Sequence, residues 1–241
     1  MQLTAVGFSP LPDIQTARHD LGLHDLSDKD VAKVLFHRRK QSGHGEQLGW
    51  EQSLLGVVSL LRLNERDARI ETLSLAEVEE PQIIESVLRA LRDAAPLVTW
   101  HPGFMPLFHF RCLKQRRSAA DYWTLLGDGL SPHVDLRATF GSEGAPGLDA
   151  MARSLQLPGM LGSQESQLWD LWLAGDHAGV AAYADYQALN TALIGLDIFH
   201  LQGKVSRDDL KLRQEALYEL LNSPPLEERF HAFCAHWIPT P

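Results

Sequence analysis

Few residues of this 241-residue chain have a spacing that points to chemistry. His133 and Asp135 are two residues apart, so an extended backbone would place both side chains on the same side. There they could contribute to a site, or they could form a satisfied buried polar pair. His101 follows Trp100 at the end of a short apolar run. It could face a cleft or lie in a loop without a role.

Other constellations typical of enzymes are not recognisable in the sequence. We find no Ser-His-Asp set, Walker loop or nucleotide-binding fingerprint, and the glycine-rich stretch 141–147 is typical of a flexible loop. Cys112 and Cys234 lie far apart and outside any CxxC pair. Neither a disulfide framework nor a zinc site is therefore expected.

The charge balance limits the partners that the chain can attract over long distances. It has 22 basic and 31 acidic residues, which gives a formal net charge of −9. Long-range attraction to a nucleic-acid backbone is therefore not built in. Two local basic clusters, at 36–41 and 111–117, could still contact phosphates or could form solvated helix faces.

The N-terminal segment carries no feature of a secretory signal. It has no basic region, its apolar run is too short, and no stretch approaches the roughly 18 apolar residues of a membrane span. We therefore expect a cytoplasmic protein that does not bind a membrane.

The hydrophobic pattern predicts an α/β fold, because strands come first, then a strand–helix–strand unit, then helices. Alternating or continuous apolar runs predict the strands, and apolar residues at helical spacing between capping signals predict the helices. The expected strands are Leu3–Phe8, 53–63, 68–75 and 96–100. The expected helices are Ser27–Gln41, 79–95, Met105–Gln115, Leu148–Leu157, Glu165–Ala174, Ala178–Leu201, 207–222 and 226–237.

Five segments in a fixed order resemble one nuclease family. They are the first strand, LPDIQTARHDLGL and its continuation over 11–43, LVTWHPGF over 97–104, PHVDL over 132–136, and a long segment over 157–206. In these the chain is similar to the predicted 3′–5′ exonucleases related to the exonuclease domain of B-type DNA polymerases. That family has a DnaQ-like, RNase H-like fold and belongs to the DEDDy group.

The resemblance implies both an architecture and a division of the chain. The fold would be a mixed five-stranded sheet flanked by helices, with a helical C-terminal half. An exonuclease-like domain would span 1–206, and residues 207–241 would form a helical extension packed on the same domain.

The resemblance also implies where the catalytic groups would stand. Such nucleases use two divalent ions about 4 Å apart, which need carboxylate ligands. The positions of the four family acids correspond to Gly7, Ser9, Met105 and Gln187, while the family's tyrosine is retained as Tyr183. Neutral side chains cannot offset two dications, so no metal cofactor is expected. We expect these five residues to converge on one cleft at the end of the sheet.

An active enzyme remains an alternative. Asp13 begins a DIQT stretch that mimics the family's DIET when the register is shifted by six residues. Asp185 lies two residues after Tyr183 and hence on a different helix face. Relocation of the acids to Asp13, Asp135 and Asp185 would give an exonuclease dependent on Mg²⁺ or Mn²⁺.

Two further hypotheses do not require catalysis. The leading one is a degenerate exonuclease that keeps a groove for the 3′ end of single-stranded DNA or RNA. Its candidate nucleic-acid contacts are Arg111, Lys114, Arg116 and Arg117. The other is a protein-interaction or regulatory module, which the charge of −9 favours. The sequence does not identify a protein partner.

Overall fold

A computed structural model of the chain describes residues 2–43, 48–92, 96–117, 123, 133–141 and 144–239. Several sequence predictions extend partly beyond these residues. Among them are the end of the helix expected over 79–95, residue 132 of the segment 132–136, residues 142–143 of the glycine-rich loop, and the last two residues of the C-terminal extension.

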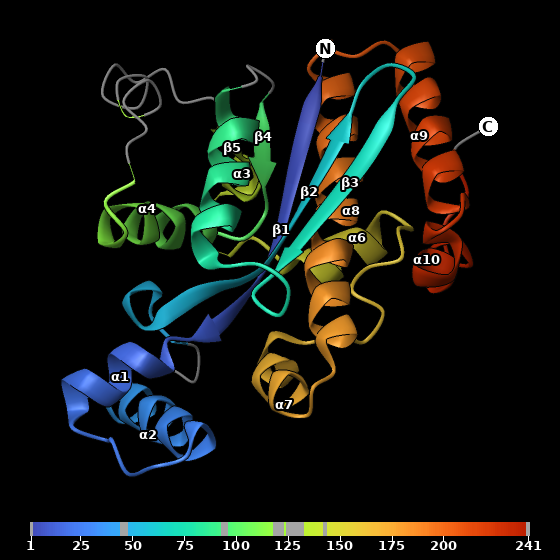
Figure 1. Cartoon of the computed structure of the whole chain (residues 1–241). Helices are drawn as coiled ribbons and strands as arrows, with labels where there is room; N and C mark the ends of the chain where they lie inside the picture. Colours follow the sequence, from blue (N-terminus) through green and yellow to red (C-terminus); the bar gives the residue numbers. More distant parts are fainter. Residues whose placement is uncertain are drawn as a thin grey trace.

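The centre of the fold is a mixed five-stranded sheet with the strand order β3-β2-β1-β4-β5 (Figure 1). β1, β2 and β3 pair antiparallel, whereas β4 and β5 join β1 in parallel. This is the mixed five-stranded sheet that the resemblance implied, and the α/β, RNase H-like class is confirmed. The strands are β1 (Leu3–Pro12), β2 (Ser53–Leu63), β3 (Ala68–Ser74), β4 (Leu97–Thr99) and β5 (His133–Asp135).

β1 continues to Pro12, four residues beyond the predicted end of the strand at Phe8. Pro10 and Pro12 still pair with β2, after a register shift between Ser9 and Pro10. A strand tolerates proline at a bulge or beside an open edge, where a missing N–H costs little. Both conditions hold here, because β4 pairs with β1 only as far as Ala5.

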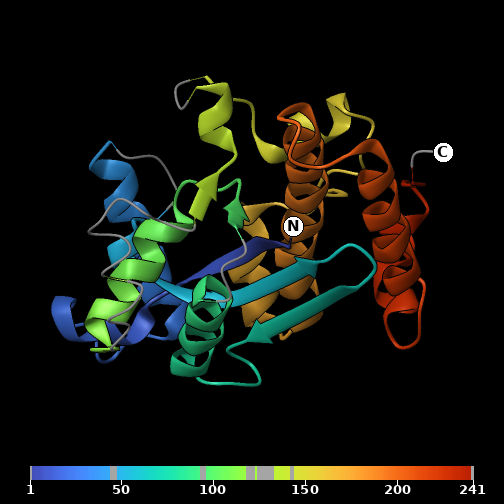
Figure 2. The ribbon, with the colours of Figure 1, turned by 90° about the horizontal axis from the view of Figure 1, so that it is seen from above.

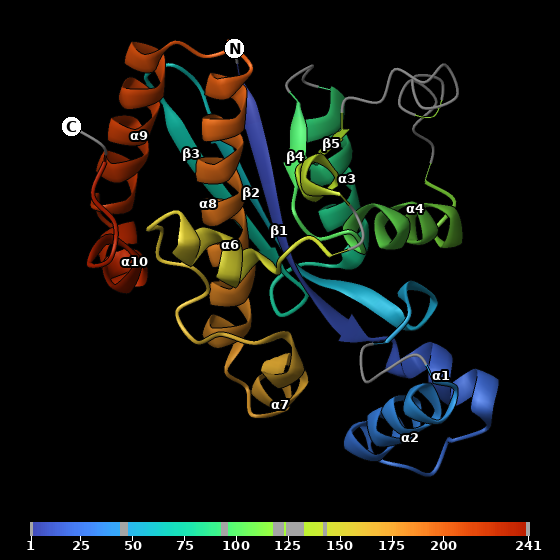
Figure 3. The same cartoon turned by 180° about the vertical axis from the view of Figure 1, so that it is seen from behind.

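Helices cover both faces of the sheet, and a pair of them lies beyond the end of β1 (Figures 1, 2 and 3). α3 and α4 lie on one face and the long α8 on the other, while α1 and α2 form a lobe at the far end of β1. The helices are α1 (Ile14–Leu21), α2 (Asp28–Gln41), α3 (Glu80–Arg92), α4 (Phe104–Lys114), α6 (Leu148–Ser154), α7 (Leu168–Leu173), α8 (His177–Leu201), α9 (Arg207–Leu221) and α10 (Leu226–Cys234).

The core divides into two layers because side chains alternate along β1. Val6 and Phe8 pack with α3 and α4, whereas Ala5 and Leu11 belong to the cluster on the side of α8. Both faces of the strand are therefore buried, which explains why β1 and β2 are almost continuously apolar.

The last two helices share the core of the α8 side. Leu217 of α9, together with Phe230 and Phe233 of α10, is fully buried in the cluster that contains Leu189 of α8. The division at residue 206 into a domain and an extension stays a prediction. Among the described residues, no helix has both the length and the apolar character to cross a bilayer.

Candidate functional site

α8 crosses β1 at Gly7, and the two backbones come into direct contact there. A Cβ atom placed on Gly7 would lie 1.8 Å from the carbonyl oxygen of Ala184 and 2.6 Å from the amide nitrogen of Ala188. Real Cβ atoms do not approach backbone atoms so closely, so any side chain at this position would displace the helix. Glycine at position 7 is therefore required by the packing of α8 on the sheet.

The next polar groups along β1 also form hydrogen bonds with α8. The Ser9 hydroxyl donates a hydrogen bond to the carbonyl oxygen of Val180 over 2.8 Å. The Phe8 amide donates to Oε1 of Gln187 over 3.1 Å, in a fully buried contact. The pairing with β4 has already ended at Ala5, so Gln187 supplies the acceptor that a neighbouring strand would have given.

A cavity of about 380 Å³ lies beside this contact. Tyr183 and Gln187 line it from α8, and His101 lines it from the loop after β4. The remaining lining residues are Trp100, Pro102, Arg137, Gly147, Leu148, Asp149, Met160, Ser163, Gln164 and Glu165. We call this space the cleft cavity.

Tyr183 and His101 meet at one carboxylate in the cleft cavity. Tyr183 is hydrogen-bonded to both Gln187 and Glu165, and burial, followed by the charge of Glu165, raises the pKa of the Tyr183 phenol. The Nε2 atom of His101 lies 3.4 Å from Oε2 of Glu165, and its Nδ1 accepts the Gly103 amide. His101 therefore faces the cleft, as one of the two sequence alternatives proposed.

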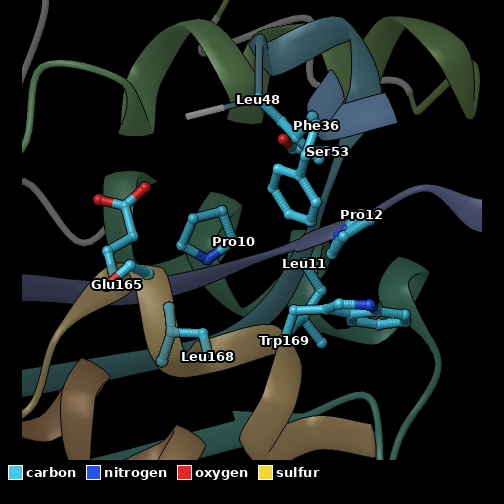
Figure 4. Close-up of a pocket in the computed structure, with 10 residues that line it drawn as sticks. Pro10, Leu11, Pro12, Phe36, Leu48, Ser53, Glu165, Leu168 and Trp169 are labelled. Carbon is cyan, nitrogen blue, oxygen red and sulfur yellow. The ribbon is translucent and has the colours of Figure 1, made fainter. Parts of the chain in front are cut away.

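A second cavity of about 270 Å³ adjoins the first and shares Glu165 with it (Figure 4). It lies where β1 passes between the α1–α2 lobe and α7. Pro10 and Leu11 of β1 line it with Phe36 of α2 and Trp169 of α7. The two cavities share only Glu165 among their lining residues, and we refer to the pair of them as the β1 groove.

Met105 does not join the other four residues of the expected cleft. It is a member of the apolar cluster that α3 and α4 form with Val6 and Phe8, and it does not line the cleft cavity. The physical reason is that α4 begins at Phe104 with an apolar stretch that packs on the opposite face of the sheet. Gly7 and Ser9 lie against α8 beside Tyr183 and Gln187, but of these four residues only Tyr183 and Gln187 line the cleft cavity. The predicted convergence is wrong for Met105.

Asp13 belongs to a buried ion-pair network and not to the cleft. Its side chain accepts the Thr16 amide at the start of α1, and it pairs with Arg111 at 2.7 Å and with Lys114 at 2.9 Å. Arg111 also donates to Glu80. Burial alone would raise the pKa of Asp13, but the bonds from Lys114, Thr16 and Arg111 outweigh it and lower the pKa to about 2.

The basic cluster at 111–117 is split by this network. Arg111 is only 5% exposed and its guanidinium is held by two carboxylates, so it presents no charge to a partner. Its expected role as a surface contact is corrected accordingly. Lys114, Arg116 and Arg117 are exposed, and their contact with nucleic acid stays a prediction.

Asp185 lies on the face of α8 that packs against β2 and β3. It is completely buried, accepts hydrogen bonds from Ser59 and Thr72, and pairs with Arg229 of α10 at 2.9 Å. The expectation that Asp185 and Tyr183 occupy different helix faces is confirmed.

His133 and Asp135 lie on β5, but each makes its own contacts. The His133 ring nitrogen Nε2 lies 2.8 Å from the Thr99 hydroxyl of β4, and burial lowers the pKa of His133 to about 4. Asp135 accepts the backbone amides of Arg137 and Ala138 in the turn that follows. Neither side chain lines the cleft cavity.

Residues 52–237 match a family model described as a predicted 3′-5′ exonuclease related to the exonuclease domain of PolB. The match runs from the start of β2 to the residues just after α10, and so covers most of the chain. The chain belongs to this exonuclease family. No curated protein and no solved structure matches it.

The side chains of this family member do not fit a pair of divalent ions. Hard dications require several oxygen ligands, most of them charged. Gly7 has no side chain, and the oxygens of Ser9 and Gln187 already have partners within the protein. Within the described ranges, no three His, Cys, Asp or Glu side chains gather in a way that could hold a metal.

Two cleft residues of this exonuclease-family chain have no signal in the sequence. Glu165 begins a short 3₁₀ helix (Glu165–Gln167) before α7, and Arg137 begins another (Arg137–Phe140) after β5. Neither occurs at a regular spacing from Tyr183 or His101. Only the way the loops return to the end of β1 brings them to the cavity.

Proposed function

We propose that this chain is a catalytically impaired member of the exonuclease family, which binds the 3′ end of a single nucleic-acid strand without cleaving it. The observation that carries the proposal is the backbone contact between β1 and α8 at Gly7. It fills the position that the resemblance assigns to the first metal-binding acid.

The loss of catalysis follows from the arrangement of neutral groups. A two-ion site would need carboxylates on β1 and α8, whereas Gly7 and Gln187 stand there in direct contact. An acid introduced at position 7 would collide with the backbone of α8. The site therefore lacks the charge for metal binding and also the space for the missing side chain.

The active alternative would need acids that converge elsewhere, and the structure does not favour it. Asp13 is held by Arg111 and Lys114, and Asp185 is held by Arg229. Asp135 caps the turn after β5. Each of these three acids already forms contacts in a different part of the structure.

The β1 groove supports binding of an extended strand. Phe36 and Trp169 line one half, and Trp100 and Tyr183 line the other. Bases stack on aromatic side chains whatever their sequence, which suits recognition of a strand end. Because the chain carries a net charge of −9, the affinity must come from these local contacts and will be salt-sensitive.

The test combines binding with turnover on the same substrate. Single-stranded DNA and RNA oligonucleotides with a fluorescent 5′ label are incubated with the protein in Mn²⁺ at low salt. We expect a rise in fluorescence anisotropy without any shortening of the strand. A duplex with blunt ends is the matched control and should bind more weakly, because its 3′ end is not free to enter the groove.

Two outcomes would overturn the proposal in different ways. Trimming of the labelled strand that disappears in Glu165→Gln would show an active enzyme. Failure of both oligonucleotides to bind at low salt, where electrostatic contacts are least screened, would favour the protein-interaction hypothesis.

A further inference from the structure

We propose that β3 and a groove beside it bind an extended segment of a partner protein, and that this segment carries a lysine or an arginine. The inference goes beyond the proposed function, because among the described residues this groove and the cleft cavity share no lining residue. It is carried by an open edge of the sheet and by the negative charge around the cavity at the end of that edge.

β3 is the outermost strand on one side of the sheet, and its outer edge offers hydrogen-bonding groups (Figure 1). The Leu75 amide donates to the Gly56 carbonyl oxygen over 2.9 Å and so continues the antiparallel ladder between β3 and β2. Alternate residues of such a ladder face the neighbouring strand, so the N–H and C=O groups of Ile70 and Thr72 point outward. In the part of the chain that the structure describes, no hydrogen bond reaches these backbone groups.

The edge of β3 lacks most of the features that keep a strand from pairing with other chains. Natural edges are protected by short strands, prolines, bulges or charged side chains. β3 is seven residues long, contains no proline and pairs with β2 without a register shift. Its exposed charges, Arg69 and Glu71, alternate with Ile70 and Thr72 and therefore point to the other face of the sheet. The edge is therefore able to accept another strand.

A cavity of about 670 Å³ lies at the C-terminal end of this edge, and we call it the edge groove. Thr72 and Ser74 line it from β3, and Ala178, Ala181 and Ala182 line it from the first turns of α8. Because these side chains of α8 are small, the groove has room for a side chain of a bound segment. Its volume lies in the range of pockets that hold ligands.

The positive groups that line the edge groove are already matched by acids. Arg229 of α10 pairs with the buried carboxylate of Asp185 at 2.9 Å. The N-terminus of α8 carries a partial positive charge, but its capping residue Asp176 accepts the Gly179 amide there. Neither group is therefore left to bind an anion.

The acidic side chains of the edge groove have no such partners. Glu77 follows the end of β3 and Glu228 lies in the first turn of α10, and both are exposed. Among the described residues, neither of them forms an ion pair. The uncompensated charge of the groove is therefore negative, which favours a cationic side chain. Exposed carboxylates contribute little affinity, so they serve mainly to select the partner.

The open edge and the acidic groove fit one mode of recognition. A segment that adds to a sheet edge gains affinity from main-chain hydrogen bonds and specificity from pockets for its alternate side chains. The residue that pairs with Thr72 points to the same face as the Thr72 side chain, which lines the edge groove. A lysine or arginine at that position can lay its apolar stem over the alanines of α8 and reach the glutamates with its charged end.

The experiment uses short, capped, fluorescently labelled peptides in which valine and threonine alternate around one central residue. We expect the peptide with a central arginine to bind about fivefold more tightly at low salt than the peptide with a central glutamate. A version that is N-methylated on the amides facing the edge keeps every side chain. It should bind about tenfold more weakly, since it cannot donate hydrogen bonds to β3. Fluorescence anisotropy measures the three affinities.

Three variants test the place of binding. Ala178→Trp fills the edge groove from an exposed position and should weaken the arginine peptide severalfold. The double variant Glu77→Lys with Glu228→Lys should reverse the preference, so that the glutamate peptide binds more tightly. Glu219→Lys, which changes an exposed acid of α9 that does not line the groove, is the matched control and should leave the preference unchanged. Melting temperatures establish that each variant is folded.

Hydrogen exchange on the unaltered protein locates the peptide independently of any variant. The Ile70 and Thr72 amides should exchange with solvent more slowly when the arginine peptide is bound. Unchanged exchange at both amides under saturating peptide would overturn the inference.

The remaining outcomes separate this inference from the proposed function. Equal affinity for the arginine and glutamate peptides, or no binding of either, would overturn the partner-binding surface. A dimer of the chain in sedimentation without peptide, with slow exchange of the Ile70 and Thr72 amides, would overturn it as well, because a second copy would then occupy the edge. Peptide binding without any binding of the oligonucleotide would support this surface and overturn strand binding alone.

Discussion

The two sides of α8 differ in charge. Tyr183 and Gln187 line the cleft cavity with neutral polar groups, whereas the buried carboxylate of Asp185 lies on the opposite side of the helix. Asp185 is matched by Arg229 and by the hydroxyls of Ser59 and Thr72. Gln187 instead accepts a backbone amide of β1. The fold accepts a buried carboxylate where it also supplies a cation.

At the far end of β1, a buried carboxylate again lies beside cations. Asp13 is buried beside Arg111 and Lys114, and Arg111 is in turn held by Glu80. Both buried acids thus have structural roles, since an ionised group in the interior needs a charged or hydrogen-bonding partner. The contact between β1 and α8 around Gly7 contrasts with both regions because the groups that meet there are neutral.

The largest effect is expected on the charged face of α8. Asp185→Ala leaves Arg229 and two hydroxyls without their acceptor, and loss of one partner of a buried pair costs about 3–5 kcal/mol. Urea denaturation measures the loss in the free energy of unfolding. Glu228→Ala, an exposed change on the same helix as Arg229, is the control. A loss below 1 kcal/mol for Asp185→Ala would show that the buried contacts of this carboxylate do not stabilise the fold.

The neutral contact should be nearly as sensitive, but for steric reasons. Gly7→Ala forces a Cβ against the backbone of α8, and we expect a loss of about 3 kcal/mol in the free energy of unfolding. Gly195→Ala, on α8 itself, is the matched control, because its new Cβ would meet side-chain atoms and no backbone, the nearest being on Leu136 at 3.3 Å. Equal stability of the two variants would contradict the close packing at Gly7.

The ion pairs of Asp13 should make stability depend on acid pH. The folded pKa of Asp13 is lowered from 3.8 to about 2, so its contribution is complete above pH 3.8 and is lost as pH falls through 2. The contribution at neutral pH is about 2 kcal/mol. Asp13→Asn should therefore be less stable than the parent at pH 7, and the difference should shrink toward pH 2. A pH-independent difference would show that the charge of Asp13 is not involved.

The smallest effect is expected for the amide in the cleft. Gln187→Met keeps the volume but leaves the Phe8 amide without its acceptor, at a cost of about 1 kcal/mol. Thermal denaturation resolves a change of this size. Gln214→Met, a buried glutamine of α9, is a control for the same substitution away from the cleft. A stabilised Gln187→Met variant would show that the amide contact is not used.

Regular elements were predictable where a local pattern determines them. The apolar run of β2 and the capping residue Ser27 of α2 gave the correct boundaries. β1 was predicted too short, because its prolines act as stops only when the strand is fully paired on both sides. Local sequence does not show that β4 ends at Thr99 and leaves this edge open.

The candidate site was predictable only along one helix and one strand. The family resemblance assigned Tyr183, Gln187, Gly7 and Ser9 to one site, and in the structure the two helix residues and the two strand residues meet where α8 packs on β1. Arg137 was not predicted, because its place depends on how a loop returns to the cavity. The burial of Arg111 depends on Asp13, which lies 98 residues earlier in the chain, and no local pattern reveals such a contact.

The central claim is that neutral packing of α8 on β1 has replaced the metal site of the family. Titration of the protein with Mn²⁺, followed by the electron paramagnetic resonance signal of the free ion, tests this directly. We predict that the free-ion signal rises in proportion to added Mn²⁺, with no binding tighter than about 1 mM. Two ions bound per chain, with their binding lost in Glu165→Gln, would contradict the account.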